Sequence, residues 1–305
     1  MASFDKPKGG TELMFDELML RLSPEIRDRF SIFNYYNQAD FRKKTIYWNQ
    51  LSTDQEAVNW LSDPVNVSSI DHFVFVSFWQ AENFRKAFNI PGFKTKVIQN
   101  ACIGVDGRQQ GEREGVKLCY TSTPWRGLDV LLEAWEKMDT SGCELHVFSS
   151  CDIYGKQFAD SENPKFLDLY EKCQSLEGVV YRGSIPNYEL RKELPSFDIL
   201  AYPNTFEETS CISVIEALSA GLRVVTSDLG ALPETSEGWA SMYPYFTDKS
   251  RHAKFFSSLL AEEIQLIRNG LDTSLQREIY APKWSWDKRI IQWTNFLNML
   301  DQKES

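Results

Sequence analysis

The stretch Glu208-Thr-Ser-Cys-Ile-Ser-Val-Ile-Glu216, together with Ala217-Leu-Ser-Ala-Gly-Leu-Arg-Val-Val225 that follows it, decides the fold. An apolar run at 198–202 precedes this stretch, and an apolar helical pattern within it stops at Gly221. Glycine directly after the last apolar position is a common helix end, and the run at 223–226 then has the composition of a strand. The order strand, helix, strand predicts the repeating unit of a parallel sheet.

Two carboxylates, Glu208 and Glu216, lie on either side of the predicted helix start. A helix N-terminus offers unpaired N–H groups and a partial positive charge, which favour a phosphate. A carboxylate further along the helix can accept hydrogen bonds from sugar hydroxyls. The stretch therefore indicates a nucleotide-sugar site. An acidic first turn that stabilises the helix dipole is the simpler explanation for Glu208, and it is a weaker one for Glu216, which interrupts an apolar helix face.

The composition bounds the class of protein. The chain has 305 residues, of which 42% are apolar and 25% charged, and this balance is typical of a soluble globular protein with room for two domains. The net charge of −10, without a basic tract, argues against nucleic acid as a partner. The N-terminus MASFDKPKGG is polar and no apolar run approaches roughly 20 residues, so we expect neither a signal peptide nor a transmembrane segment.

The six cysteines form no Cys-x-x-Cys pair, and the chain has three histidines. We therefore expect no metal site, and free thiols in the reducing environment of the cytoplasm. His72 and His146 fall at predicted strands and His252 at a predicted helix, so a structural role is the simpler interpretation for all three.

Short β-rich runs alternate with helical stretches along the whole chain, which predicts an α/β fold with parallel sheets. Gly104–Gly115 is glycine-rich, charged and without periodicity, so we interpret it as a linker between two doubly wound units. We expect an N-terminal domain at 1–107, a C-terminal domain at 116–283, and a helix at 284–305 that returns to the N-terminal domain. Ligands of such sheets bind at the carboxyl ends of the strands, so the predicted site is a cleft between the domains. The predicted strands are 30–34, 45–48, 73–77 and 96–98 in the first domain and 116–121, 144–149, 179–182, 198–202 and 223–226 in the second.

Three further segments suit a phosphate site. Gly9 and Gly10 precede a helical pattern, and paired glycines let a ligand approach the backbone, although a lone glycine pair is more often an ordinary turn. Arg126 lies between a predicted strand and a predicted helix, where a cation can neutralise a leaving phosphate or simply contact solvent. The segment 226–234 follows a strand, so we expect it to line the same cleft, although its glycine and proline also suit a structural turn.

Taken in order, these segments resemble the retaining glycosyltransferases of family 4, which have the type B fold of two facing Rossmann-like domains. The resemblance covers most of the chain and is densest from Val116 to Glu234. Residues 208–216 are similar to the Glu-x7-Glu motif of that family, and Arg126-Gly127 is similar to its Lys-Gly helix start. The segment 179–190 looks like the one that lies beside the nucleotide base.

The resemblance implies a role for each of these residues. Glu216 would bind the ribose hydroxyls, Glu208 would lie near the donor sugar, and Arg126 would neutralise the departing diphosphate. Transfer in that family retains the anomeric configuration, with the leaving phosphate helping to deprotonate the acceptor, and needs neither a metal nor another cofactor. Glu208 and Arg126 are thus the implied catalytic residues. The implied donor-binding residues are Lys8, Gly9, Gly10, Thr121, Ser122, Arg182, Gly183, Thr209, Ser210, Cys211, Ile212 and Glu216.

The chain departs from the family pattern at three places. The Gly-Arg that precedes the family's Lys-Gly is absent, Thr121 or Ser122 stands there, and Lys8 is the cation that can replace it. The family's histidine in the acceptor-side domain has no counterpart, and residues 48–50 occupy that region. Cys211 stands where the motif usually has a small glycine. The acceptor region is therefore the part on which the sequence says least.

We expect an enzyme: a retaining glycosyltransferase that moves a hexose from a nucleoside-diphosphate sugar to a glycan or another hydroxyl-bearing acceptor. On family frequency, GDP-mannose is the first donor to test and UDP-glucose the second. The departures leave open a non-catalytic nucleotide-sugar-binding or glycan-binding protein on the same scaffold, and an epimerase or phosphorylase of this fold is a third alternative. The sequence does not determine the acceptor, the linkage or the oligomeric state, for which a homodimer is one of the options.

Overall fold

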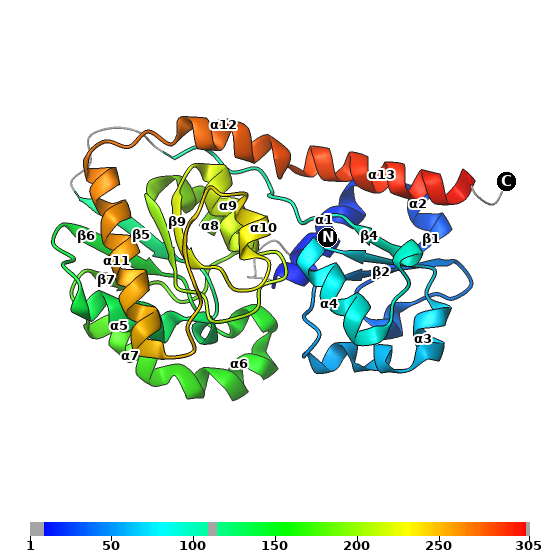
Figure 1. The fold of residues 1–305 in the computed structure, drawn as a ribbon, viewed down its shortest axis with the longest axis horizontal. Helices are drawn as coiled ribbons and strands as arrows, with labels where there is room; N and C mark the ends of the chain where they lie inside the picture. Colours follow the sequence, from blue (N-terminus) through cyan, green and yellow to red (C-terminus); the bar gives the residue numbers. More distant parts are fainter. Residues whose placement is uncertain (1–8, 109–114, 303–305) are drawn as a thin grey trace.

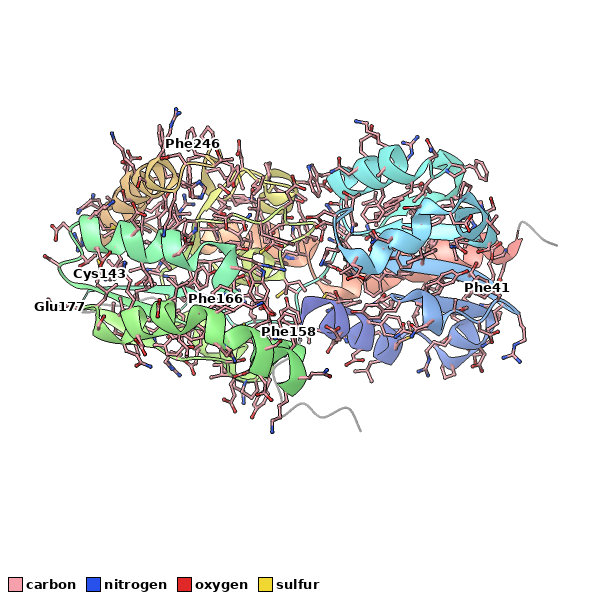
Figure 2. All side chains as sticks on the ribbon, turned by 90° about the horizontal axis from the view of Figure 1, so that it is seen from below. Phe41, Cys143, Phe158, Phe166, Glu177 and Phe246 are labelled. Atoms are coloured by element: carbon pink, nitrogen blue, oxygen red, sulfur yellow. The ribbon has the colours of Figure 1, made fainter. Side chains whose placement is uncertain are left out.

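Two parallel sheets, one in each half of the chain, form the framework of the computed structural model, which describes residues 9–108 and 115–302 (Figure 1). Helices follow most of the strands, so each half is an α/β domain with Rossmann-like connections. Figure 2, turned by 90°, shows the same two domains side by side. The α/β fold with two Rossmann-like domains that the sequence predicted is therefore present.

The N-terminal sheet has the strand order β1-β2-β3-β4, and each strand is parallel to its neighbour. Successive residues of a strand point to opposite faces, and both faces of a parallel sheet are usually buried. Tyr47 and Phe75 pack with α4 on one face, whereas Trp48 and Val74 pack with α1 and α13 on the other. The elements of this domain are α1 (Gly10–Arg21), α2 (Pro24–Arg29), β1 (Phe30–Phe33), β2 (Lys44–Asn49), α3 (Pro64–Ser69), β3 (His72–Phe75), α4 (Phe78–Phe88) and β4 (Thr95–Val97).

The C-terminal sheet has the order β10-β9-β8-β5-β6-β7, again with all neighbours parallel. The chain enters at β5, continues to one edge through β6 and β7, and returns to β8 on the other side of β5. The loops after β5 and β8 therefore flank the point where the strand order reverses, at which open α/β sheets bind their ligands. The strands are β5 (Val116–Tyr120), β6 (Cys143–Val147), β7 (Val179–Tyr181), β8 (Ile199–Tyr202), β9 (Arg223–Ser227) and β10 (Ser241–Tyr243).

Three helices and one strand of the C-terminal domain, α6, α10, α12 and β10, were not predicted from the sequence. Strand β10 and the helices α6 and α10 are too short to establish a period, and α12 contains Pro282, which weakens a helical pattern. The helices are α5 (Leu128–Lys137), α6 (Lys156–Glu162), α7 (Leu167–Ser175), α8 (Asn187–Glu193), α9 (Ile212–Ala220), α10 (Leu232–Ser236), α11 (Lys249–Arg268) and α12 (Ser274–Lys283).

The chain passes between the domains at two adjacent points. The N–H group of Cys102 donates to the Trp284 carbonyl at 2.7 Å, which joins the outgoing and returning segments. Arg108 is already attached to the C-terminal domain, because its Nε donates to Asp198 Oδ1 at 2.8 Å. The first crossing therefore precedes most of the glycine-rich segment that the sequence analysis interpreted as the linker. Residues 109–114 of that segment lie outside the described part of the chain.

Helix α13 (Trp286–Gln302) runs along the N-terminal domain, whereas α12 lies over the C-terminal domain (Figure 1). Trp293 on α13 is 1% exposed, and its ring meets that of Trp48 edge to face with 5.1 Å between the centroids. The last helix thus completes one face of the N-terminal sheet. Neither α13 nor any other helix in the described part of the chain is long and apolar enough to cross a membrane.

We expect Trp293→Ala to lower the free energy of unfolding of the N-terminal domain by about 3–5 kcal/mol, because it removes a large buried ring and leaves a cavity beside Trp48. Ile291→Ala is the control on the same helix: this side chain is 60% exposed, so its loss should cost less than about 0.5 kcal/mol. Urea unfolding followed by circular dichroism measures both. Equal effects of the two substitutions would contradict the packing described here.

Candidate functional site

A cavity of about 400 Å³ opens between the two domains. The C-terminal domain lines it with the loops that follow β5, β6, β7 and β8, with α8 and with the first turns of α9. The N-terminal domain lines it with the start of α1 and with residues that follow β1, β2 and β4, such as Tyr35, Gln50 and Asn100. The carboxyl ends of both sheets therefore contribute to one cavity, as expected for ligand sites in open α/β sheets.

The N-termini of α1 and α9 meet in this cavity. A Cβ atom added to Gly10 of α1 would lie 2.9 Å from Cδ1 of Ile212, the first residue of α9. Cys211 precedes α9, and its side chain makes no capping hydrogen bond. Burial, with a smaller effect of Glu208, raises the pKa of the Cys211 thiol well above its ordinary value, so the thiol stays neutral. The two helix ends thus present partial positive charge without a competing anion from Cys211, which suits an anionic ligand.

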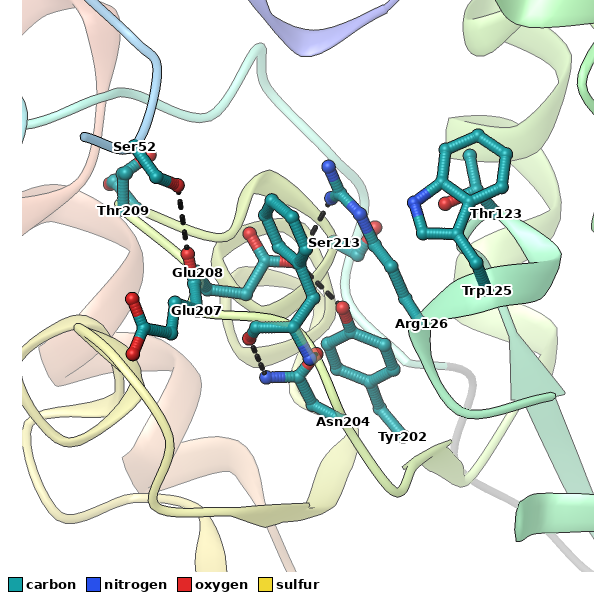
Figure 3. Close-up of polar contacts among 12 residues, drawn as sticks. Ser52, Thr123, Trp125, Arg126, Tyr202, Asn204, Glu207, Glu208, Thr209 and Ser213 are labelled. Atoms are coloured by element: carbon teal, nitrogen blue, oxygen red, sulfur yellow. Dashed lines mark hydrogen bonds and ion pairs between the residues drawn. The ribbon is translucent and has the colours of Figure 1, made fainter. Parts of the chain in front are cut away.

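Glu208 is the centre of a buried polar cluster (Figure 3). Its Oε1 atom accepts hydrogen bonds from Arg126 Nη1 at 3.0 Å and from the Tyr202 hydroxyl at 2.6 Å. The Arg126 guanidinium also lies over the Phe206 ring, 4.3 Å from its centroid. Burial disfavours the charge of Arg126, but the Glu208 carboxylate outweighs it and the pKa of Arg126 is raised. The arginine therefore stays charged inside the cavity.

Gly127 explains how Arg126 reaches this position. It has φ +107°, in the left-handed region that favours glycine, and it forms the turn between the residues after β5 and helix α5. A Cβ atom at this residue would lie 2.0 Å from the Pro203 carbonyl oxygen, which follows β8. Only glycine lets the two loops of the switch point come this close, and this approach brings Arg126 within reach of Glu208.

Glu216 lies on α9 and also lines the cavity. It is buried, and its Oε1 is 3.6 Å from Arg191 Nη1 on α8. Neither of these two atoms has a hydrogen-bond partner in the described structure. Burial raises the pKa of Glu216 to about 7, although the Arg191 charge opposes the shift. A buried carboxylate oxygen without a hydrogen-bond donor is costly, so hydroxyl or amide donors of a ligand would stabilise Glu216.

Residues 116–260 match the model of the family described as Glycosyl transferases group 1. This stretch contains Arg126, Glu208 and Glu216, and it spans all of the described C-terminal sheet. In this stretch the chain resembles the group 1 glycosyltransferases.

The chain also resembles curated proteins along part of their length. It is 28% identical over 171 residues to an uncharacterised 41.2 kDa protein in the cps region of Klebsiella pneumoniae, covering 54% of this chain and 45% of that protein. It is 23% identical over 272 residues to the GPI3 subunit of phosphatidylinositol N-acetylglucosaminyltransferase from Saccharomyces cerevisiae, covering 84% of this chain and 54% of that one. The chain spans about half the length of these curated relatives.

Solved structures share the type B glycosyltransferase fold. Sucrose-phosphate synthase from Thermosynechococcus elongatus aligns with a TM-score of 0.67 at 14% identity, over 90% of this chain and 74% of that one. HepE from Anabaena, solved with UDP-glucose, aligns with a TM-score of 0.63 at 16% identity, over 85% and 73%. The pneumococcal O-GlcNAc transferase GtfA, solved with UDP and GlcNAc, aligns with a TM-score of 0.64 at 13% identity, over 94% and 59%. At these identities the likeness establishes the fold alone.

The structure places most of the predicted site residues in one cavity. Thr209 is fixed there by the N-terminal domain, because its hydroxyl donates to the Gln50 carbonyl at 2.9 Å. Gly9 directly precedes α1 and lies beside the cavity, and Lys8 lies outside the described residues. The predicted residues that line the cavity are Gly10, Thr121, Ser122, Arg126, Gly183, Glu208, Thr209, Ser210, Cys211, Ile212 and Glu216.

The structure places two predicted elements of the C-terminal domain outside the cavity. Arg182 does not line the cavity: its Nη2 donates to Glu193 Oε1 at 2.8 Å and its guanidinium covers the Phe148 ring, so local partners hold it in place. The segment 226–234 does not line the cavity either. Instead, the Glu234 carboxylate accepts hydrogen bonds from the first backbone N–H groups of α4, at 2.9 Å from Phe78, and thereby caps a helix of the other domain.

Several cavity residues were missed by the sequence analysis. Glu12, Tyr35 and Gln55 line it from the N-terminal domain, and Tyr154 lines it from the loop after β6. Their positions depend on how the two domains face each other, which no local pattern encodes. Within residues 9–108 and 115–302, no group of three or more His, Cys, Asp or Glu side chains is placed to hold a metal ion.

We expect Gly127→Ala to destabilise the protein more than Gly238→Ala does. Both glycines have positive φ, but a Cβ atom at Gly238 meets no atom within 4 Å, so that substitution isolates the conformational strain of about 1–3 kcal/mol. Gly127→Ala adds an overlap with backbone, which should cost about 1–3 kcal/mol more and displace Arg126. Thermal unfolding of both variants measures the difference. Indistinguishable midpoints would contradict the close approach of the two loops.

Proposed function

We propose that the protein is a retaining glycosyltransferase that takes its sugar from a nucleoside-diphosphate sugar. One observation carries this proposal: a single cavity joins the open N-terminus of α9 with the buried Glu216 carboxylate, whose Oε1 accepts no hydrogen bond, on one side and the Arg126–Glu208 ion pair on the other. These groups suit, in turn, a diphosphate, a ribose and a leaving-group charge. The group 1 family match and the type B fold support the same assignment.

The donor is proposed to lie along α9. Its diphosphate would accept hydrogen bonds from the backbone at the start of α9 and from Gly10 at the start of α1. Its ribose hydroxyls would donate to Glu216, satisfying the buried Oε1 atom. The base would lie near Gly183 and Leu190, which line the adjoining end of the cavity.

Arg126 is proposed to stabilise the diphosphate as the bond between the sugar C1 atom and the phosphate oxygen breaks. The acceptor oxygen would form its bond to C1 on the same face, and its proton would pass to the leaving phosphate. Glu208 Oε1 already accepts hydrogen bonds from Arg126 and from the Tyr202 hydroxyl. We therefore assign Glu208 to holding Arg126 in place, not to removing a proton. This mechanism uses no metal or other cofactor.

The donor panel should include three nucleotide sugars. GDP-mannose and UDP-glucose are the first two on the sequence resemblance, and the similarity to an N-acetylglucosaminyltransferase subunit adds UDP-N-acetylglucosamine. The proposed acceptor is a glycan or another molecule with a free hydroxyl.

We expect isothermal titration calorimetry to detect binding of one member of this panel by the wild-type protein. Glu216→Ala should weaken that binding at least tenfold, because two hydrogen bonds to a charged acceptor are worth more than about 1.4 kcal/mol. Glu262→Ala, an exposed glutamate on α11, is the control and should bind like the wild type. Lack of binding to every nucleotide sugar would refute the proposal.

We also expect nucleotide-sugar affinity to fall as the pH is lowered through about 7. Burial raises the pKa of Glu216 to about 7, and its ionised form accepts stronger hydrogen bonds from the ribose hydroxyls than its protonated form does. The affinity should therefore be constant above pH 8 and decline by up to about tenfold per pH unit below the pKa. Glu216→Gln should remove this dependence. Calorimetry with a nucleotide sugar, whose diphosphate does not titrate in this range, measures it, and an equal slope in both proteins would contradict the assignment.

A non-catalytic nucleotide-sugar-binding protein would use the same cavity. The absence of the family's Gly-Arg before Arg126 favours this alternative, since Thr121 and Ser122 at that position carry no charge. Turnover separates the two functions. Release of free nucleoside diphosphate from the bound donor, with or without an acceptor, supports the enzyme, whereas binding without turnover supports the alternative.

A further inference from the structure

Each of the two glutamates at the start of α9 is paired with an arginine of its own. Glu208 pairs with Arg126, which lines the cavity, whereas Glu216 pairs with Arg191 on α8, which does not line it. We propose that Arg191 is a positioning residue of the donor site: it holds the Glu216 carboxylate in its charged form for the ribose without contacting the donor. This inference rests on the proposed nucleotide-sugar function and adds a residue to the same site.

Helix α8 brings Arg191 to Glu216 from behind the cavity. Asn187 and Leu190 of this helix line the cavity, and Arg191 lies one turn after Asn187, on the same side of the helix. Its Nη1 atom is 3.6 Å from Glu216 Oε1, and the two side chains are 13% and 9% exposed. Because Glu216 lines the cavity and Arg191 does not, the arginine approaches the carboxylate from the protein interior and leaves the cavity to the ligand.

The two charged groups are close but not hydrogen-bonded to each other. Neither Arg191 Nη1 nor Glu216 Oε1 has a hydrogen-bond partner in the described structure. Their separation of 3.6 Å is too long for a good hydrogen bond but short enough for a strong attraction between charges. Without Arg191, the Glu216 carboxylate would be buried with no counter-charge from α8, so its protonated form would be favoured.

Burial and Arg191 act in opposite directions on Glu216. Burial raises the pKa of the carboxyl group, and the Arg191 guanidinium opposes this shift. The Cys102 thiol, from the segment after β4, also lies close enough to interact with Glu216, but burial raises the pKa of this thiol far above its ordinary value. Cys102 therefore stays neutral in the physiological range, whereas a guanidinium stays charged throughout it. A pH dependence of ribose binding thus reports on the pair of Arg191 and Glu216.

The experiment measures the affinity for UDP-glucose, GDP-mannose or UDP-N-acetylglucosamine, whichever the wild-type protein binds, by calorimetry between about pH 6 and pH 8.5. Arg191→Met removes the charge and keeps a long side chain, so the fall in affinity should begin at least about one pH unit higher than in the wild type. At pH 7 the affinity should be at least about fivefold weaker, and this difference should shrink as the pH rises.

Two further variants of α8 serve as comparisons. Arg191→Lys keeps the charge, so its pH midpoint should lie closer to that of the wild type than the midpoint of Arg191→Met does. Lys192→Met is the matched control, because it removes an exposed cation from the next position of the same helix. This control should have the affinity and the pH midpoint of the wild type.

A double-mutant cycle separates positioning from a general structural role. With Glu216→Gln in place, no carboxylate is left to position, so adding Arg191→Met should change the affinity less than about twofold. If Arg191→Met alone fails to fold, recovery of folding by the added Glu216→Gln also supports the inference, since the second substitution removes the uncompensated carboxylate.

Four outcomes would overturn the inference. These are an unchanged affinity in Arg191→Met, a loss of the same size at every pH, a loss of the same size in the Glu216→Gln background, and a folding defect that Glu216→Gln does not repair. Each would show that Arg191 does not act on the donor through the charge of Glu216. Failure of the proposed function is distinguishable, because the wild-type protein would then bind no nucleotide sugar.

Discussion

One buried carboxylate, Glu208, joins the loops on which the site depends. Its side chain holds Arg126 from the loop after β5 and Tyr202 at the end of β8, so it bridges the switch point of the C-terminal sheet. Its backbone pairs with Gly230 after β9, where a Cβ atom would lie 2.6 Å from the Glu208 carbonyl oxygen. Removing one partner of a buried ion pair typically costs about 3–5 kcal/mol, because the other charge is left uncompensated. The geometry around the proposed leaving group therefore rests on this pair.

The residues beside Glu208 attach the same segment to the other domain. The Glu207 carbonyl accepts a hydrogen bond from the Ser52 hydroxyl at 3.4 Å, and the Ser210 carbonyl accepts one from Asn100 Nδ2 at 3.2 Å (Figure 3 shows the first). Each bond alone is worth about 1 kcal/mol. Together with the Glu234 cap on α4, they fix the start of α9 against the N-terminal domain. The proposed donor site is therefore held in one geometry by contacts between the domains.

Much of the fold and of the donor half of the site could be predicted from the chain itself. Except for β10, the strands of both sheets follow from apolar runs bounded by turn residues, and the start of α9 between Glu208 and Glu216 follows from a helical pattern that ends at Gly221. Arg182 shows where such reasoning fails. The family resemblance implied a donor-binding role for this residue, but Glu193 and the Phe148 ring provide local partners that a linear pattern does not reveal.

The sequence by itself determined the parallel α/β units and a helix N-terminus suited to bind phosphate. The hydrophobic period, the helix-capping residues and the positions of glycines are local properties of the chain. Only the tertiary structure decided which side chains share the cavity. Glu12 and Tyr35 are separated from Tyr154 by more than a hundred positions, and they meet because the return of α13 to the N-terminal sheet and the contacts around Glu208 fix one domain against the other. The same docking explains why Glu234 caps α4 instead of lining the cleft. Packing between distant segments has no signature in local sequence, so the N-terminal side of the cavity emerges only when both domains are in place.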